Sequence, residues 1–164
     1  MIVKDTMVII HLAKITLLEK SCRYFKRVLI PEEVHREILA GQEKGYEDVT
    51  ITQELVTSEK ISIKRVQDKS FLRRAQEFNV QRGEAEALAL YWQEKAEYLA
   101  TDDDALRKRS TVMDLKIIGT PAIVLKLYQE KLIEKRKFQD SVHALKKIGW
   151  FSPVVIDHIL MEAS

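Results

Sequence analysis

Five short, mostly apolar segments recur along the chain, and helix-like spacing of apolar residues separates most of them. Four are nearly continuous apolar runs, and the third alternates between apolar and polar residues, as strands do. The segments are residues 1–4, 27–31, 61–66, 98–101 and 116–118. This alternation of strands and helices predicts an α/β fold with three layers, in which helices cover both faces of a central, mostly parallel sheet.

The predicted helices follow these strands in order. Pro31 is expected at the first helical position, because its fixed φ suits a helix start and acids follow it in the first turn. Residues 41–60 are polar and predict a helix end, a connection and a short helix. The other predicted helices are residues 6–18, 69–78, 84–95, 122–128, 132–148 and 154–161.

Length and cysteine content narrow the class of protein. A chain of 164 residues suits one domain, residues 1–164. No run of about 18 apolar residues predicts a membrane span, and the N-terminus lacks the pattern of a signal peptide. The single Cys22 excludes an internal disulfide and suits a reducing compartment. We therefore expect a cytoplasmic protein with no membrane segment.

Three consecutive acids, Asp102, Asp103 and Asp104, follow the predicted strand at residues 98–101. One or two of them can be explained as the cap and first turn of the next helix, since Asp is favoured at both places. The third has no such explanation. Open α/β sheets bind ligands at the carboxyl ends of their strands, so at least one of these side chains is a candidate functional acid.

Further acids occupy comparable places. Asp5 ends the first predicted strand, and Glu37 lies near the edge of the buried stripe of its helix. Glu84 and Glu86 begin the helix before the fourth strand, where the helix dipole alone could explain either one. These two glutamates cannot face the same way, because positions i and i+2 diverge on a helix.

If acids from these separate segments converge, their charge must be compensated. Two carboxylates about 4 Å apart repel by roughly 4 kcal/mol at an effective dielectric near 20. Oxygen-only ligands suit hard cations, so the expected cofactor is Mg²⁺ or Mn²⁺. Such an ion can activate water and stabilise a phosphoryl transition state. Zinc is not expected, because cysteine is nearly absent and the four histidines show no ligand spacing.

The order of these motifs resembles that of PIN-domain nucleases, most closely the archaeal and bacterial proteins similar to VapC-type toxins. The resemblance lies in residues 5–10, 31–37, 83–87, 101–107 and 118–120. Each motif is short, and their order and spacing make the match specific. The resemblance covers nearly the whole chain and implies one PIN-like nuclease domain, a parallel sheet between helices, and metal-dependent cleavage of RNA.

The resemblance also implies roles for individual residues. Asp5, Glu37, Glu84 and Asp103 match the four catalytic acids of the family. Of these, Asp5, Glu84 and Asp103 are the expected metal ligands, and the surplus acids Glu86 and Asp102 are further candidates. The chain departs from the family pattern in having Glu84 where many relatives carry Asp. Asp104 is another surplus acid, so the choice among the three consecutive Asp residues stays open.

Contacts with nucleic acid must come from local basic residues, since the net charge is only +2. Arg107 is the best candidate for a phosphate contact, because it lies one helical turn after Asp103. Arg82, just before Glu84, is a second candidate. The resemblance implies RNA as substrate, a homodimer, and a cognate antitoxin as partner, with the chain as the toxin.

Two other functions remain open from the residues. A phospho-receiver-like domain also places acids and Mg²⁺ on such a sheet, but it needs paired acids after the first strand, where this chain has Asp5 and Thr6. A catalytically inactive PIN-like domain that only binds partners is the other alternative. The presence of all four acids favours an active enzyme.

Overall fold

Five parallel strands form one sheet in the order β3-β2-β1-β4-β5. The structure is a computed structural model that describes residues 1–41, 47–149 and 151–164. The strands are β1 (Ile2–Lys4), β2 (Val28–Pro31), β3 (Ile61–Lys64), β4 (Tyr98–Ala100) and β5 (Ile117–Ile118). All five were predicted from the apolar segments, and the parallel sheet confirms the predicted α/β class.

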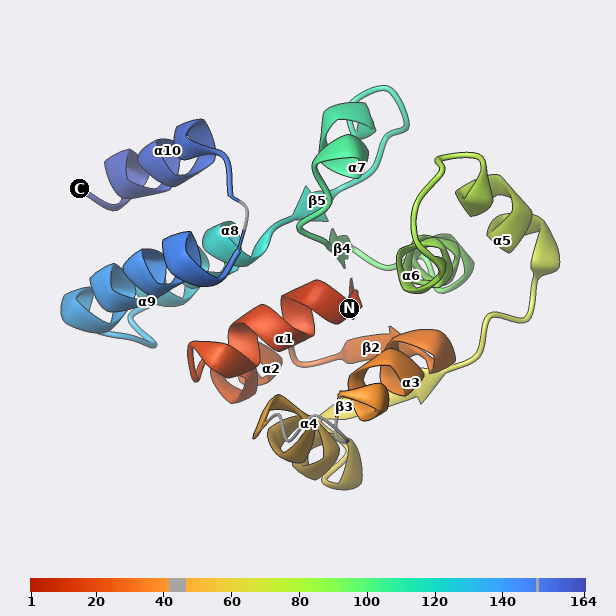
Figure 1. The fold of residues 1–164 in the computed structure, drawn as a ribbon, viewed down its shortest axis with the longest axis horizontal. Coiled ribbons are helices and arrows are strands. Elements are labelled where there is room, and N and C mark those ends of the chain that lie inside the picture. Colours follow the sequence, from red (N-terminus) through yellow and green to blue (C-terminus); the bar gives the residue numbers. More distant parts are fainter. Residues whose placement is uncertain (42–46, 150) are drawn as a thin grey trace.

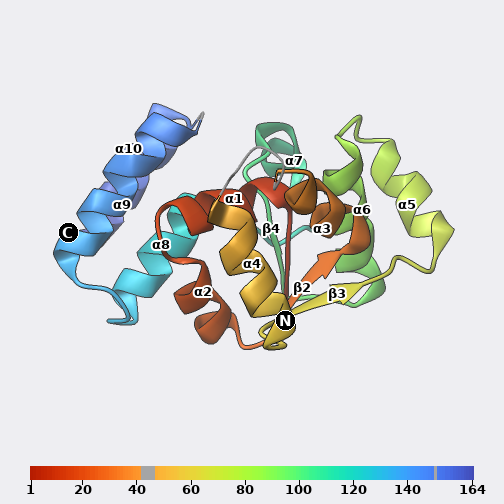
Figure 2. The ribbon, with the colours of Figure 1, turned by 60° about the horizontal axis from the view of Figure 1, so that its bottom comes forward.

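Helices cover both faces of this sheet and give the predicted three-layer α/β/α fold. Figure 2 shows α5 and α6 on one side and α1, α2 and α8 on the other, with α9 and α10 at the end of the molecule far from α5. The helices are α1 (Thr6–Lys14), α2 (Leu18–Phe25), α3 (Glu32–Ala40), α4 (Glu47–Thr57), α5 (Lys69–Gln76), α6 (Arg82–Gln93), α7 (Asp104–Arg109), α8 (Thr120–Gln129), α9 (Lys135–Ile148) and α10 (Pro153–Ala163).

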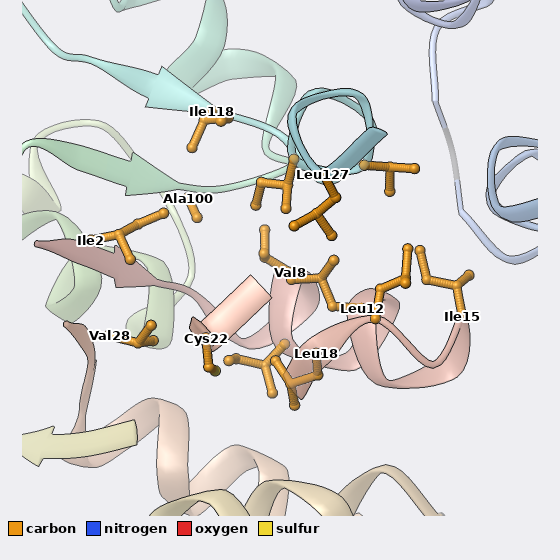
Figure 3. Packing of buried hydrophobic residues seen from close by; sticks show 14 of the residues in the cluster. Ile2, Val8, Leu12, Ile15, Leu18, Cys22, Val28, Ala100, Ile118 and Leu127 are labelled. Atoms are coloured by element: carbon orange, nitrogen blue, oxygen red, sulfur yellow. The ribbon is translucent and has the colours of Figure 1, made fainter. Parts of the chain in front are cut away.

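Alternating strand residues supply two separate apolar clusters. Ile2 and Ala100 belong to the cluster beneath α1, α2 and α8, part of which Figure 3 shows. Val3 and Leu99 point the other way and pack against α6 and its neighbours. Because both faces of β1, β2 and β4 are buried, these strands read as nearly continuous apolar runs in the sequence. This burial fixes the register and therefore the place where each strand ends.

Strand β1 lies at the centre, between β2 and β4, and its end brings separate parts of the chain together. Lys4 pairs in register with Ala100, so the residues that follow, Asp5 and Thr101, leave the sheet side by side. The backbone N–H of Asp5 donates to the carbonyl of Ala100 at 3.0 Å. From β1 the chain adds β2 and then β3 on one side of the sheet, and it later returns to add β4 and β5 on the other side of β1 (Figure 1). This reversal is where open α/β sheets bind ligands.

Some boundaries differ from the sequence prediction. The helix predicted over residues 6–18 ends at Lys14, because Thr16 takes a left-handed conformation with φ of 61°, and α2 then begins at Leu18. Pro31 is the last residue of β2 and caps α3 rather than starting it. The helix predicted from residue 132 begins at Lys135.

Two further expectations concern the middle of the chain and the membrane. Helix α4 confirms the short helix expected within residues 41–60, while the connection at residues 42–46 lies outside the described residues. No helix in the described ranges has the length and apolar content needed to cross a bilayer.

Candidate active site

Asp5 is the most deeply buried acid at the carboxyl end of the sheet, with 1% of its surface exposed. It caps helix α1, and its Oδ1 accepts the backbone N–H of Val8 at 3.0 Å. Its Oδ2 is buried and has no hydrogen bond of acceptable geometry among the described residues. The hydroxyl of Thr101 lies near enough to favour the ionised carboxylate. Asp5 therefore has one oxygen held by the helix and one left without a partner.

Burial, together with the neighbouring charges of Asp102 and Glu84, raises the pKa of Asp5 to about 8. The backbone N–H of Val8 and the nearby hydroxyl of Thr101 only partly oppose this effect. A neutral carboxyl or a bound cation removes the cost of burying this charge. Asp5 thus has the electrostatic properties of a functional acid, although its capping of α1 is also structural.

Asp102 lies next to Asp5 and is held by three hydrogen bonds. Its Oδ1 accepts the backbone N–H of Thr120 at 2.7 Å, and its Oδ2 accepts the Thr120 hydroxyl at 2.6 Å. The same Oδ2 lies 2.8 Å from Nδ1 of His11. A Cβ atom at Gly119 would lie 3.1 Å from Asp102 Oδ1, so the glycine allows close approach at this point. These contacts join α1, the end of β4 and the start of α8.

Asp103 and Asp104 have different surroundings from Asp102 and from each other. Asp103 is the N-cap of α7: its Oδ1 accepts the N–H of Leu106 at 2.7 Å, and its own N–H donates to the Thr101 hydroxyl. Asp104 is exposed and pairs with Arg107 at 2.5 Å and Lys108 at 2.9 Å. These hydrogen bonds lower the pKa of Asp104. Of the three acids, Asp104 is the one that faces solvent.

Glu37 reaches the start of α6 from α3. Its Oε1 accepts the backbone N–H of Gly83 at 3.1 Å, and its Oε2 accepts the hydroxyl of Thr6. A Cβ atom at Gly83 would lie only 2.6 Å from Oε1. The absence of a side chain at Gly83 therefore makes room for the carboxylate of Glu37.

Glu84 lies beside these groups in the first turn of α6. Its Oε2 accepts the N–H of Gln81 at 3.2 Å, which places it in a cap as well as near the other acids. Burial raises the pKa of Glu84, and the charges of Asp103 and Glu37 add to the rise. The charge of Glu84 therefore interacts with those of Asp5, Glu37 and Asp103.

Glu86 points elsewhere, as its position on the helix requires. It lies 3.9 Å from Nε of Arg82, which is also 3.6 Å from Glu33. Burial raises the pKa of Glu86, and the charge of Glu33 adds to the rise while Arg82 opposes it. Arg82, the second candidate RNA contact, is thus engaged with this pair of glutamates. Neither residue is among the groups that interact with Asp5.

Five acids from four segments therefore adjoin one another in pairs: Asp5, Glu37, Glu84, Asp102 and Asp103. In the part of the chain that is described, no three His, Cys, Asp or Glu side chains already enclose a cation-sized space. The donor chemistry nevertheless fits a hard divalent cation. The ligands are all oxygens, one buried oxygen has no hydrogen-bond partner among the described residues, and burial together with mutual repulsion raises the pKa values of Asp5 and Glu84.

A family model described as DUF3368, a PIN domain, matches residues 1–164. The chain belongs to the PIN-domain family. Comparisons with curated proteins and with solved structures gave no match. PIN domains are generally nucleases that act on nucleic acids, and they typically use divalent metal ions. The adjoining acids at the end of the sheet are the groups of this PIN domain that suit that chemistry.

Sequence reasoning did not identify three side chains that support the acids of this PIN domain. His11, Thr120 and Thr6 each hydrogen-bond to an acid. His11 lies on the buried face of α1 with 5% exposure, where the sequence indicated only packing. Threonines at helix starts are usually caps, so neither threonine stood out. A polar residue within an apolar stripe was the one available signal, at His11.

Proposed function

We propose that this PIN domain is a Mg²⁺- or Mn²⁺-dependent endoribonuclease that hydrolyses phosphodiester bonds in RNA. One observation carries the proposal: Asp5 is buried with an unpartnered Oδ2, next to Asp102 and Glu84. A fold does not retain such a group for stability, because burying an unpaired charge or polar atom costs free energy. Strained groups of this kind are typical of functional sites.

Asp5, Glu84 and Asp103 are the proposed metal ligands. Each has a carboxylate oxygen that its helix cap leaves unused, since Oδ1 of Asp5, Oε2 of Glu84 and Oδ1 of Asp103 make the capping bonds. Capping fixes each carboxyl group relative to a helix start, so the free oxygens are held in place before a ligand binds. A bound divalent ion supplies an activated water and neutralises charge on the phosphate.

Glu37 and Asp102 complete the set as groups with fixed positions. Glu37 spans α3 and α6 and adds negative charge beside Glu84. Asp102 adds negative charge beside Asp5 and is held by Thr120 and His11. Together they add enough negative charge that the site needs cations. Their contacts also keep the metal-binding acids from moving apart. Glu86 is not part of the proposed set.

The charge of the substrate supports the same conclusion. Each carboxylate at the end of the sheet repels a phosphate group. Cations that offset the acids therefore favour the approach of RNA to this edge. Hydrolysis then requires a water oxygen to bond to phosphorus while one P–O ester bond breaks and the departing oxygen takes a proton. The fixed carboxylates orient that water.

The test is cleavage of end-labelled single-stranded RNA by the purified protein, with millimolar Mn²⁺ or Mg²⁺ and with EDTA. Single-stranded DNA and duplex RNA of the same sequence serve as matched substrates. Cleavage of RNA that needs the metal and is lost in EDTA is the expected result. Equal cleavage in EDTA would contradict the metal-dependent proposal. No cleavage under any condition would leave the inactive binding module as the better description.

The finer biological role is the toxin of a toxin–antitoxin pair, acting in the cytoplasm. It rests on the resemblance to VapC-type proteins, together with a single cysteine that is buried. The expected partners are RNA, a second copy of the chain and a cognate antitoxin. All proposed functional residues come from one sheet and its helices, which supports one nuclease domain over residues 1–164. Co-expression with the protein encoded next to it should reveal whether a small partner binds the chain and blocks cleavage.

A further inference from the structure

A cleft of about 430 Å³ opens beside the acids, between α7 and the start of α10. These two elements lie on opposite sides of the carboxyl end of β5 in Figure 1. The volume falls within the roughly 300–1,000 Å³ that is usual for small-molecule sites. Thr101 and Asp102 line the cleft and also adjoin Asp5. The cleft is therefore continuous with the proposed active site.

One wall of the cleft is cationic. Arg107 and Lys108 project from α7, with 45% and 74% of their side chains exposed, and both pair with the single carboxylate of Asp104. Exposed ion pairs of this kind contribute little to stability. Because two cations share one acid on α7, this wall keeps a local positive charge although Asp102 balances it over the whole cleft, and either side chain can turn to an anionic ligand.

Another part of the lining is apolar and contains an aromatic ring that is held in place. Phe151 is half-buried and lines the cleft with Val155. Its ring packs against His11, with 5.3 Å between ring centroids. It also lies so close to Gly149 that a Cβ atom there would collide with it. A fixed, partly exposed ring that lines the same cleft as two cations suits a ligand with a flat apolar part and an anionic part.

We propose that this cleft binds one unpaired nucleotide of the substrate strand, with its base on Phe151 and its phosphate against Arg107 and Lys108. The proposal rests on the proposed nuclease function and specifies how that site selects its substrate. Base stacking on an aromatic ring tolerates any base and contributes to binding of single strands. A base in a duplex is already stacked and paired, so it cannot enter without strand opening. The acids beside the cleft would then meet the adjoining backbone of the same strand.

The first test measures binding of a short fluorescent RNA in EDTA, where cleavage does not interfere. Phe151→Leu should weaken binding about tenfold, as expected for one lost stacking contact. It should not weaken binding of an abasic strand of the same length. Phe71→Leu is the matched control, because Phe71 is also half-buried but lies on α5, away from the cleft. Equal affinities of wild type and Phe151→Leu for the intact strand would overturn the proposal.

The cationic wall makes a second, opposite prediction. Replacing both Arg107 and Lys108 with Gln should weaken binding of intact and abasic strands alike, because phosphate contacts do not depend on the base. Asp104→Asn should tighten binding of both, because it releases the two cations and removes a negative charge. Weaker binding by Asp104→Asn would contradict the assignment of this wall to phosphate.

Photocrosslinking of wild-type protein gives a readout that does not depend on how a variant folds. A single-stranded RNA containing 5-iodouridine should crosslink to the peptide that contains Phe151, and crosslinks confined to other peptides would overturn the cleft as the site. The nuclease proposal can fail separately. Metal-dependent cleavage with no effect of Phe151 on binding would refute only the nucleotide site. A clear effect of Phe151 on binding without cleavage would refute only the nuclease.

Discussion

His11 Nδ1 lies 2.8 Å from Asp102 Oδ2, a contact that ties the middle of α1 to the end of β4. The other ring nitrogen of His11 is buried without a hydrogen-bond partner among the described residues. Among the described residues, the His11 ring therefore makes its polar contact with Asp102, the acid next to Asp5. Together with Thr120, it fixes the orientation of the Asp102 carboxyl group.

The contact predicts that His11→Ala reduces RNA cleavage about tenfold, whereas His11→Asn retains most of it. The amide nitrogen of Asn can occupy the position of Nδ1, and Ala has no donor. Both variants lose ring packing against Phe151, so both should melt at lower temperature. Rates at saturating Mn²⁺ and melting temperatures check this. Equal losses of activity in the two variants would show that His11 acts only through packing and not through its hydrogen bond to Asp102.

Gly83→Ala should separate activity from stability. Ala is favoured over Gly within a helix by about 1 kcal/mol, but its methyl group would displace the carboxylate of Glu37. The side chain of Glu37 can swing away, so we expect a melting temperature close to that of wild type and cleavage reduced at least tenfold. Thermal melting and single-turnover cleavage measure the two effects. Full activity would show that the position of Glu37 does not matter to the reaction.

Two matched pairs of variants test which neighbouring acids act. Glu84→Gln and Asp103→Asn should abolish cleavage, while Glu86→Gln and Asp104→Asn should retain it. Glu86 interacts with Arg82 and Glu33, and Asp104 faces solvent. Asn is nearly as good an N-cap as Asp, so Asp103→Asn should leave α7 intact. If Asp103→Asn were active and Asp104→Asn inactive, the fourth catalytic acid would be Asp104 and not Asp103.

The raised pKa of Asp5 predicts how stability without metal depends on pH. In the unfolded chain this carboxyl releases its proton near pH 4, whereas in the folded protein it holds the proton up to about pH 8. The folded state therefore binds more protons between these values, and the contribution of Asp5 to stability falls as pH rises from about 4 to about 8. Above that window the loss is complete.

Asp5→Asn carries no titrating group and should escape this loss. In EDTA, its melting temperature should exceed that of wild type by a margin that is near zero at about pH 4 and grows steadily to pH 8, since about 1 kcal/mol shifts the melting temperature of a chain this size by 2–4 °C. Calorimetry at pH 5, 6, 7 and 8 measures the margin. A margin that stays constant over this range would contradict the raised pKa.

The sequence was a good guide wherever the decisive pattern was local. Apolar runs marked four of the strands and alternation marked β3, which is mostly exposed, and the acid that ends β1 was identified from its position alone. The turn at Thr16 was missed because its left-handed residue is not a glycine. The predicted helix over residues 6–18 was therefore too long. Local pattern also marks Asp103 and Asp104 as a helix start.

The parts of the site that depend on distant contacts could not be predicted from local pattern. Asp102 hydrogen-bonds to Thr120, 18 residues away in the sequence, and to His11, 91 residues away. Glu37 accepts a hydrogen bond from the backbone of Gly83, 46 residues away in the sequence. These pairings follow from the order of strands and the packing of α3 on α6, which no periodicity encodes. The family resemblance suggested which acids converge, but not what holds them.

The central claim is that the acids at the end of β1 and β4 bind a divalent cation, and Mn²⁺ titration followed by electron paramagnetic resonance measures this directly. Wild type at pH 7.5 should bind Mn²⁺ and release protons as it does so, because Asp5 must ionise to bind the ion. Asp5→Asn should bind at least tenfold more weakly, and Asp104→Asn should match wild type. Binding by Asp5→Asn equal to that of wild type, or no binding by wild type at millimolar Mn²⁺, would contradict the account.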